Sequence, residues 1–200
     1  MQPGVLNDIG NALCRFFAEN GIQPYNEETG RGLVRHIFLR RGAHSGQIMV
    51  CLVCTRPNLP HADALCTRLR EQFADIATIL LNVNSKNTNV ILGTETHTLY
   101  GPGYIEDTLC GVPVQLGPLS FYQVNTLAAE RLYGIAAQYA QLTPDDLLLD
   151  LYCGMVPSAF PWWTTAGSWW AWRSCPKPSR APRPMPPAWG MLWPQRAASS

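Results

Sequence analysis

LLLDLYCG, residues 147–154, is the stretch that decides the fold of this chain. Its leucines and Asp150 are typical of a buried strand that runs into a tight turn, which Gly154 completes. A glycine at such a turn lets the polar end of a cofactor approach backbone that a Cβ atom would block. The stretch therefore predicts a βα unit of a doubly wound α/β domain, with a cofactor turn at the end of its strand.

The residues just before this stretch supply the preceding elements of such a unit. An apolar segment, VPVQL, begins at Val112, and a helical pattern follows, for which Asn125 or Thr126 is placed as the N-cap. The helix has a broad apolar stripe made of Leu127, Leu132, Ile135, Ala136, Tyr139 and Leu142. Strand, helix, turn and strand open a doubly wound domain, so we predict its first part over residues 113–154.

Residues 1–112 predict a separate central α/β domain, in which mixed strands pack under two helices. Helical spacing and β-rich runs alternate along this part of the chain. The expected elements are a helix at 5–21, a hairpin of 32–42 with 46–55, a helix at 59–73, a buried strand at 77–84, and a short strand pair of NTNVILG (87–93) with THTLYG (96–101).

Residues 155–200 have a different composition from the rest. All seven tryptophans and more than half of the 17 prolines lie here, and neither Asp nor Glu occurs after Asp150. We interpret this Trp/Pro-rich tail as out of frame and disordered, without a packed core and without pairing to the strand at 147–151. Reading GSWWAWRSCPKPSRAP in the neighbouring frame permits ELVGVEIVPEAVESA, a strand ending in an acidic residue before a helix. The alternative is that the chain is a genuine small α/β protein with an unusual disordered tail.

Charge and hydropathy exclude some broad classes of protein. Fifteen basic residues against 14 acidic ones give a net charge of +1, so any RNA contact must be local. A local basic face is one interpretation of Arg35, Arg40, Arg41, Lys86, His36 and His44, and ordinary solvated charge is the other. The chain shows neither a signal peptide nor a run of roughly 18 apolar residues, which predicts a cytoplasmic protein without a membrane partner.

The seven cysteines are scattered and odd in number, which argues against a disulfide framework. Cys51 and Cys54 are the only close pair. Residues three apart in a strand point to opposite faces, so we predict buried cysteines there rather than a metal or redox site. Among the other polar residues, we interpret His36 and His97 as structural histidines. We interpret Glu106 and Asp107 as polar residues of a helix or turn.

Five ordered pieces of the chain carry a resemblance to a known family. They are GLVRHIFLRRGAHSGQIMVCLV, NTNVILG, LYGPGYIEDTL, LGPLSFYQVNTLAAERLY and LLLDLYCG. In these pieces the chain resembles the S-adenosylmethionine (SAM)-dependent RNA uracil-5-methyltransferases, specifically the bacterial 23S rRNA group. The resemblance implies a central α/β domain followed by the start of a Rossmann-like class I methyltransferase domain. It also implies a monomer acting on 23S rRNA, with Gln123 and Tyr152 lining the SAM pocket and Gly154 forming the cofactor turn.

The same resemblance implies that other parts of the enzyme are missing. In the family a cysteine thiolate adds to uracil C6 and a glutamate base removes the C5 proton, and both lie far past the L-Y-C-G turn. We therefore expect no catalytic residue in this chain, with neither Cys153 nor Cys175 acting as the nucleophile. The family's oligonucleotide-binding barrel and iron-sulfur cysteines would precede Met1, so no cluster or other metal is expected. The chain should therefore be an inactive fragment. The alternative is a non-enzymatic RNA-binding module that keeps only the central domain. The choice of target uridine would depend on RNA contacts that lie partly outside this chain.

Overall fold

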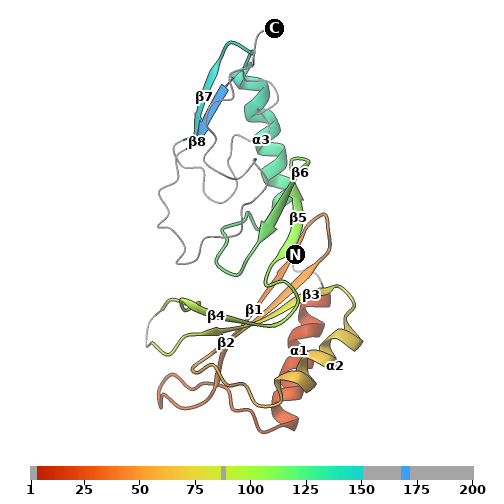
Figure 1. The fold of residues 1–200 in the computed structure, drawn as a ribbon, viewed down its shortest axis with the longest axis vertical. Helices are drawn as coiled ribbons and strands as arrows, with labels where there is room; N and C mark the ends of the chain where they lie inside the picture. The colour runs from red at the N-terminus through yellow and green to blue at the C-terminus, as the bar shows by residue number, and fades with distance from the viewer. Residues whose placement is uncertain (1–3, 87–88, 151–167, 172–200) are drawn as a thin grey trace. The chain divides into compact units, whose positions relative to one another are not determined.

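The computed structural model describes residues 4–86, 89–150 and 168–171 of the 200-residue chain (Figure 1). The fold is mixed α/β, as expected from the sequence. The chain divides into two compact units, each described by itself below. The first takes the residues up to Thr108 together with Pro113–Ser120, and the second takes Leu109–Val112 and the described residues from Phe121 onward.

A four-stranded sheet with the order β1-β2-β3-β4 forms the centre of the first unit. Its strands are β1 (Val34–Arg41), β2 (Ile48–Cys54), β3 (Ile76–Val83) and β4 (Glu95–Tyr100). β1 and β2 form the expected antiparallel hairpin, β2 and β3 are parallel, and β4 pairs antiparallel with β3. The parallel pair requires a crossover, which helix α2 (Ala62–Gln72) provides. Every residue of β2 is buried, as its continuous apolar run predicts.

Helices α1 (Gly4–Glu19) and α2 lie together on one side of this sheet (Figure 1). The inward face of α1 follows the helical period and buries Leu6, Ile9, Ala12, Leu13, Phe16 and Phe17. Gly21, at φ 63°, lets the chain leave the helix, and the Ile22 amide donates back to the Phe17 carbonyl over 2.9 Å. At the surface an ion pair between Glu19 and Arg68 joins the two helices.

The two close cysteines lie buried in β2, which confirms that part of the sequence analysis. Cys54 belongs to the core packed under the helices, whereas the alternation of the strand turns Cys51 to the opposite face. Burial raises the pKa of the Cys51 thiol to about 11. Burial, with a smaller effect of Cys51, raises the pKa of Cys54 to about 12. Neither thiol therefore ionises near neutral pH.

These raised values predict alkaline destabilisation. Above the unfolded thiol pKa of 9.0 the unfolded state loses its proton and the folded Cys54 keeps it, so stability falls as pH rises toward 12. We expect the wild-type chain to lose about 1.4 kcal/mol more per pH unit than Cys54→Ala, measured by denaturant unfolding between about pH 9.5 and 10.5. Val53→Ala, a buried truncation with no titrating group, should keep the wild-type slope. Equal slopes for wild type and Cys54→Ala would contradict the prediction.

The segment at residues 87–93, expected to be a strand, is not one in its described part, residues 89–93. Side-chain amides replace the ladder hydrogen bonds there. The Asn84 side chain donates to the carbonyls of Val90 (2.7 Å) and Ile91 (3.1 Å). Because these bonds come from a buried side chain at the end of β3, the segment is held as a loop, and β4 alone continues the sheet.

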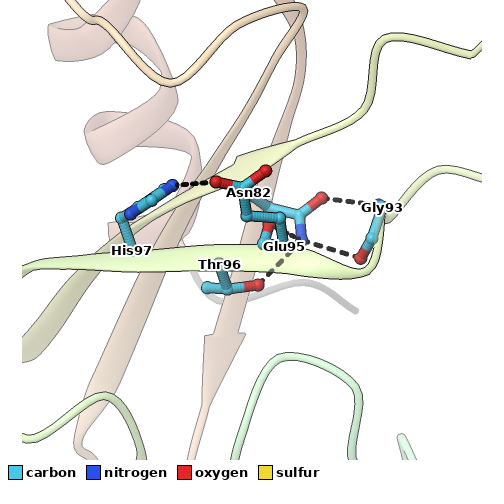
Figure 2. A network of polar contacts seen from close by, with 5 residues as sticks. All are labelled: Asn82, Gly93, Glu95, Thr96 and His97. Atoms are coloured by element: carbon cyan, nitrogen blue, oxygen red, sulfur yellow. Dashed lines mark hydrogen bonds and ion pairs between the residues drawn. The ribbon is translucent and has the colours of Figure 1, made fainter. Parts of the chain in front are cut away.

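Asn82 holds the end of the same loop (Figure 2). Its amide nitrogen donates to the carbonyls of Gly93 and Glu95 and to the Thr96 hydroxyl over 2.8–3.1 Å, and its oxygen accepts from the Gly93 amide over 2.6 Å. A buried carboxamide with this many partners specifies one loop conformation. His97 pairs with the Glu95 carboxylate over 2.7 Å at the exposed surface, which agrees with its reading as a structural histidine.

Strands β5 (Ile105–Leu109) and β6 (Val112–Leu116) form a two-stranded sheet. Glu106 and Asp107 lie in β5, so their assignment to a helix or turn was wrong. The alternation of β5, with Glu106 exposed and Asp107 buried, is that of a half-buried strand. The tight connection between the strands has Cys110 at φ 50° and Gly111 at φ 79°, as a two-residue hairpin turn requires.

The second unit contains α3 (Thr126–Ala140) and the strand β7 (Leu147–Asp150), in the predicted order. Asn125 is the N-cap, and its side chain accepts from the Ala128 amide over 3.1 Å. The predicted apolar stripe of α3 is largely uncovered, because Leu127, Leu132, Ile135 and Tyr139 are exposed.

The prediction that the tail does not pair with the strand at 147–151 was wrong for four residues. Ser168–Ala171 forms β8, which pairs in parallel with Leu147–Asp150 of β7. Strand pairing is made by backbone groups, and aromatic residues such as the two tryptophans of this segment suit a strand. The remainder of the 155–200 tail, and with it the expectation of disorder, lies outside the described residues.

Candidate cofactor-binding site

Gln123 lies in the connection between the first unit and α3. Its backbone carbonyl accepts from the Thr126 hydroxyl over 3.2 Å, and two residues later Asn125 caps the helix. The side chain of Gln123 is exposed, and among the described residues its carboxamide has no hydrogen-bond partner. A carboxamide both donates and accepts, so it is available to a polar ligand at the start of α3.

The other two predicted cofactor residues, Tyr152 and Gly154, lie outside the described residues, as does Cys153. The structure describes the strand that leads to them, β7, up to Asp150. The grouping of Gln123 with Tyr152 and Gly154 therefore stays a prediction. What fits a SAM site in the described part is the arrangement of strand, capped helix and strand, together with the free carboxamide of Gln123.

The predicted basic face contains two arginines that the structure uses internally. Arg40 donates to the carbonyls of Gly117 (2.7 Å) and Ser120 (2.8 Å), and its guanidinium lies 5.3 Å from the centre of the Phe38 ring. Burial lowers the pKa of Arg40. Because Nη1 and Nη2 each donate to a backbone carbonyl, Arg40 acts as a structural clamp on these two residues.

Arg35 makes a second clamp on a different loop. It donates to the carbonyls of Asn84 (3.2 Å) and Lys86 (2.6 Å), and its guanidinium lies 4.8 Å from the centre of the Tyr25 ring. Of the residues proposed for the basic face, Arg41, Lys86 and His44 are exposed. Arg35 and Arg40 thus both donate to backbone carbonyls of the first unit, and the local basic face stays a prediction.

Asp107 is a residue that the sequence analysis undervalued. Its carboxylate, on a residue only 3% exposed, accepts from three successive amides, those of Ala43 (2.8 Å), His44 (2.9 Å) and Ser45 (3.0 Å). It therefore ties β5 to the β1–β2 turn. Its partners lie more than 60 residues away in the sequence, so no local pattern signals them.

In the part of the chain that the structure describes, no group of three or more His, Cys, Asp or Glu side chains gathers in a way that could hold a metal ion. Among the same residues, no helix has both the length and the apolar character needed to cross a membrane.

Two bacterial proteins are similar to this chain in sequence. The chain is 42% identical over 151 residues to an uncharacterized RNA methyltransferase of Streptococcus mutans, covering 76% of this chain and 33% of the relative. It is 38% identical over 148 residues to an uncharacterized RNA methyltransferase of Staphylococcus epidermidis, covering 74% and 32%. The chain thus spans about a third of the length of these curated relatives. No protein-family model matches it.

A solved structure with a similar fold is the tRNA (uracil-54, C5)-methyltransferase of Pyrococcus abyssi in complex with S-adenosyl-L-homocysteine. The match has a TM-score of 0.56 and 26% identity, and it covers 70% of this chain and 33% of that one. The chain belongs to the family of SAM-dependent RNA uracil-C5 methyltransferases.

Proposed function

We propose that the protein from which this chain derives methylates uracil C5 in RNA, with SAM as the methyl donor. The observation that carries the proposal is the structural match to the tRNA uracil-54 enzyme, which was solved with S-adenosyl-L-homocysteine. In this chain Gln123 would bind the cofactor from the start of α3, and Tyr152 and Gly154 would meet it from the turn after β7. Bound SAM supplies the methyl group, and these residues orient it.

For the substrate we propose 23S rRNA, on the resemblance of the five sequence pieces to the bacterial 23S rRNA group. The Pyrococcus abyssi enzyme acts on tRNA, so a tRNA uridine is the second candidate. Methyl transfer to 23S rRNA fragments and to tRNA, compared in parallel, separates the two. We also propose that the protein acts in the cytoplasm as a monomer.

We further propose that residues 155–200 are out of frame and that the 200-residue chain alone is inactive. The match to the Streptococcus mutans relative spans 151 residues, close to the length that precedes the tail. The coding DNA tests the frame directly, because a single inserted or deleted base near the codon for Gly154 should restore a family-like sequence. A non-enzymatic RNA-binding module remains the alternative, and it predicts RNA binding without SAM binding.

The cofactor role of Gln123 has a direct test. We expect Gln123→Ala to weaken SAM binding to the chain about tenfold, because a hydrogen bond to the polar part of the ligand is lost. Equilibrium binding of labelled SAM measures this effect. Gln115→Ala, an exposed glutamine of β6, is the matched control and should bind SAM as the wild type does. Unchanged affinity in Gln123→Ala would remove Gln123 from the site.

A further inference from the structure

The segment that carries Gln123 begins at a turn held from outside by one side chain. Within the turn, the Gly117 amide donates to the Ser120 hydroxyl over 2.9 Å, and the Ser120 amide donates back to the Gly117 carbonyl over 3.2 Å. Arg40 of β1 then donates to the carbonyls of both residues. Gly117 and Ser120 are therefore fixed to the central sheet at both ends of the turn.

Gln123 lies between this clamp and the helix cap. Ser120, buried at 7% exposure, is three residues before Gln123, and the capping residue Asn125 is two residues after it. Ser120 is also the last residue of the first unit, and Phe121 begins the second. Since Gln123 is only a few residues from an ordered residue on each side along the chain, both limit the conformational freedom of its backbone.

We propose that Arg40 is a positioning residue for the cofactor segment, acting through its paired hydrogen bonds to Gly117 and Ser120. The inference rests on the proposed function of Gln123 as a SAM contact. Arg40 itself does not touch the cofactor; it limits the conformations of Phe121–Asn125 before the cofactor binds. Ordering a binding segment in advance raises affinity because less conformational entropy is lost on binding.

Lysine tests the clamp, because it keeps the charge but loses the planar pair of donors. Arg40→Lys should bind labelled SAM about tenfold more weakly than the wild-type chain. It should also speed amide hydrogen exchange at Gly117 and Ser120, whose amides are hydrogen-bonded within the turn. Ser120→Ala, a milder change that opens the same turn from the other side, should shift both measurements in the same direction, and the two effects should not add.

Arg35→Lys is the matched control. Arg35 also donates to two backbone carbonyls, those of Asn84 and Lys86, but from the single nitrogen Nη1 and on a loop that does not lead to Gln123. This variant should speed exchange near residues 84–86 and leave SAM affinity unchanged. A general structural defect would weaken SAM binding in both lysine variants, whereas a positioning role weakens it only in Arg40→Lys.

The outcomes separate this inference from the proposed function. Equal SAM affinity in wild type and Arg40→Lys overturns the positioning role, as does an equal loss in Arg35→Lys. If the wild-type chain binds no SAM, the proposed cofactor role fails in this chain and hydrogen exchange decides the clamp. In that case, faster exchange at Gly117 and Ser120 in Arg40→Lys supports the clamp on the turn, and unchanged exchange overturns it.

Discussion

The 200-residue chain should transfer no methyl group from SAM to 23S rRNA fragments, whereas the product of a coding sequence repaired after Gly154 should. The family resemblance implies that the nucleophilic cysteine and the base both follow the cofactor turn. Loss of general-base catalysis alone commonly costs about 100-fold to 10,000-fold, and loss of the covalent nucleophile removes the route by which uracil C5 is activated. The measurement is transfer of labelled methyl groups, with both chains assayed in parallel.

Cys153→Ser supplies the control for this experiment. Cys153 matches the cofactor turn, so we expect its substitution in the repaired chain to leave the nucleophile intact. Methyl transfer by the 200-residue chain that Cys153→Ser abolishes would show that Cys153 is the nucleophile. The claim that the catalytic half is missing would then be withdrawn.

Local sequence patterns predicted most of the helices and strands, because the spacing of apolar residues and the positions of glycines determine where these elements begin and end. The helical period and Gly21 delimit α1, and the apolar runs around Gly42 and Gly46 give the β1–β2 hairpin. The prediction failed where a distant group decides the structure. Residues 89–93 have a strand-like composition, but the side chains of Asn82 and Asn84 hold them as a loop.

The candidate site was likewise predicted only where its features are local. The helix cap is such a feature, and the sequence pattern predicted it at Asn125 or Thr126; the structure places it at Asn125. Arg40 and Asp107 have hydrogen-bond partners roughly 60–80 residues away in the sequence. From its charge alone, Arg40 was predicted to contact solvent or RNA, and Asp107 was predicted to be a polar residue of a helix or turn. Long-range hydrogen bonds of this kind follow from the tertiary fold, which a single sequence does not give.

Asp107→Asn should destabilise the first unit by about 3 kcal/mol or more. The carboxylate accepts from the amides of Ala43, His44 and Ser45, and hydrogen bonds to a charged acceptor contribute about 1.5–3 kcal/mol each. Asparagine keeps one oxygen, which can still accept from His44 and Ser45. Its NH2 group would then face the Ala43 amide, so two donors meet in a site with almost no access to water.

Glu106→Gln is the matched control for this variant, because it makes the same chemical change one residue earlier in β5. The Glu106 side chain is exposed, and the hydrogen bond of this residue to Gln47 comes from its backbone amide, which the substitution preserves. We expect a change within about 0.5 kcal/mol, the usual range for such surface positions. Denaturant unfolding of both variants measures the difference. Similar stabilities would mean that the charge of Asp107 adds little to the stability of the turn.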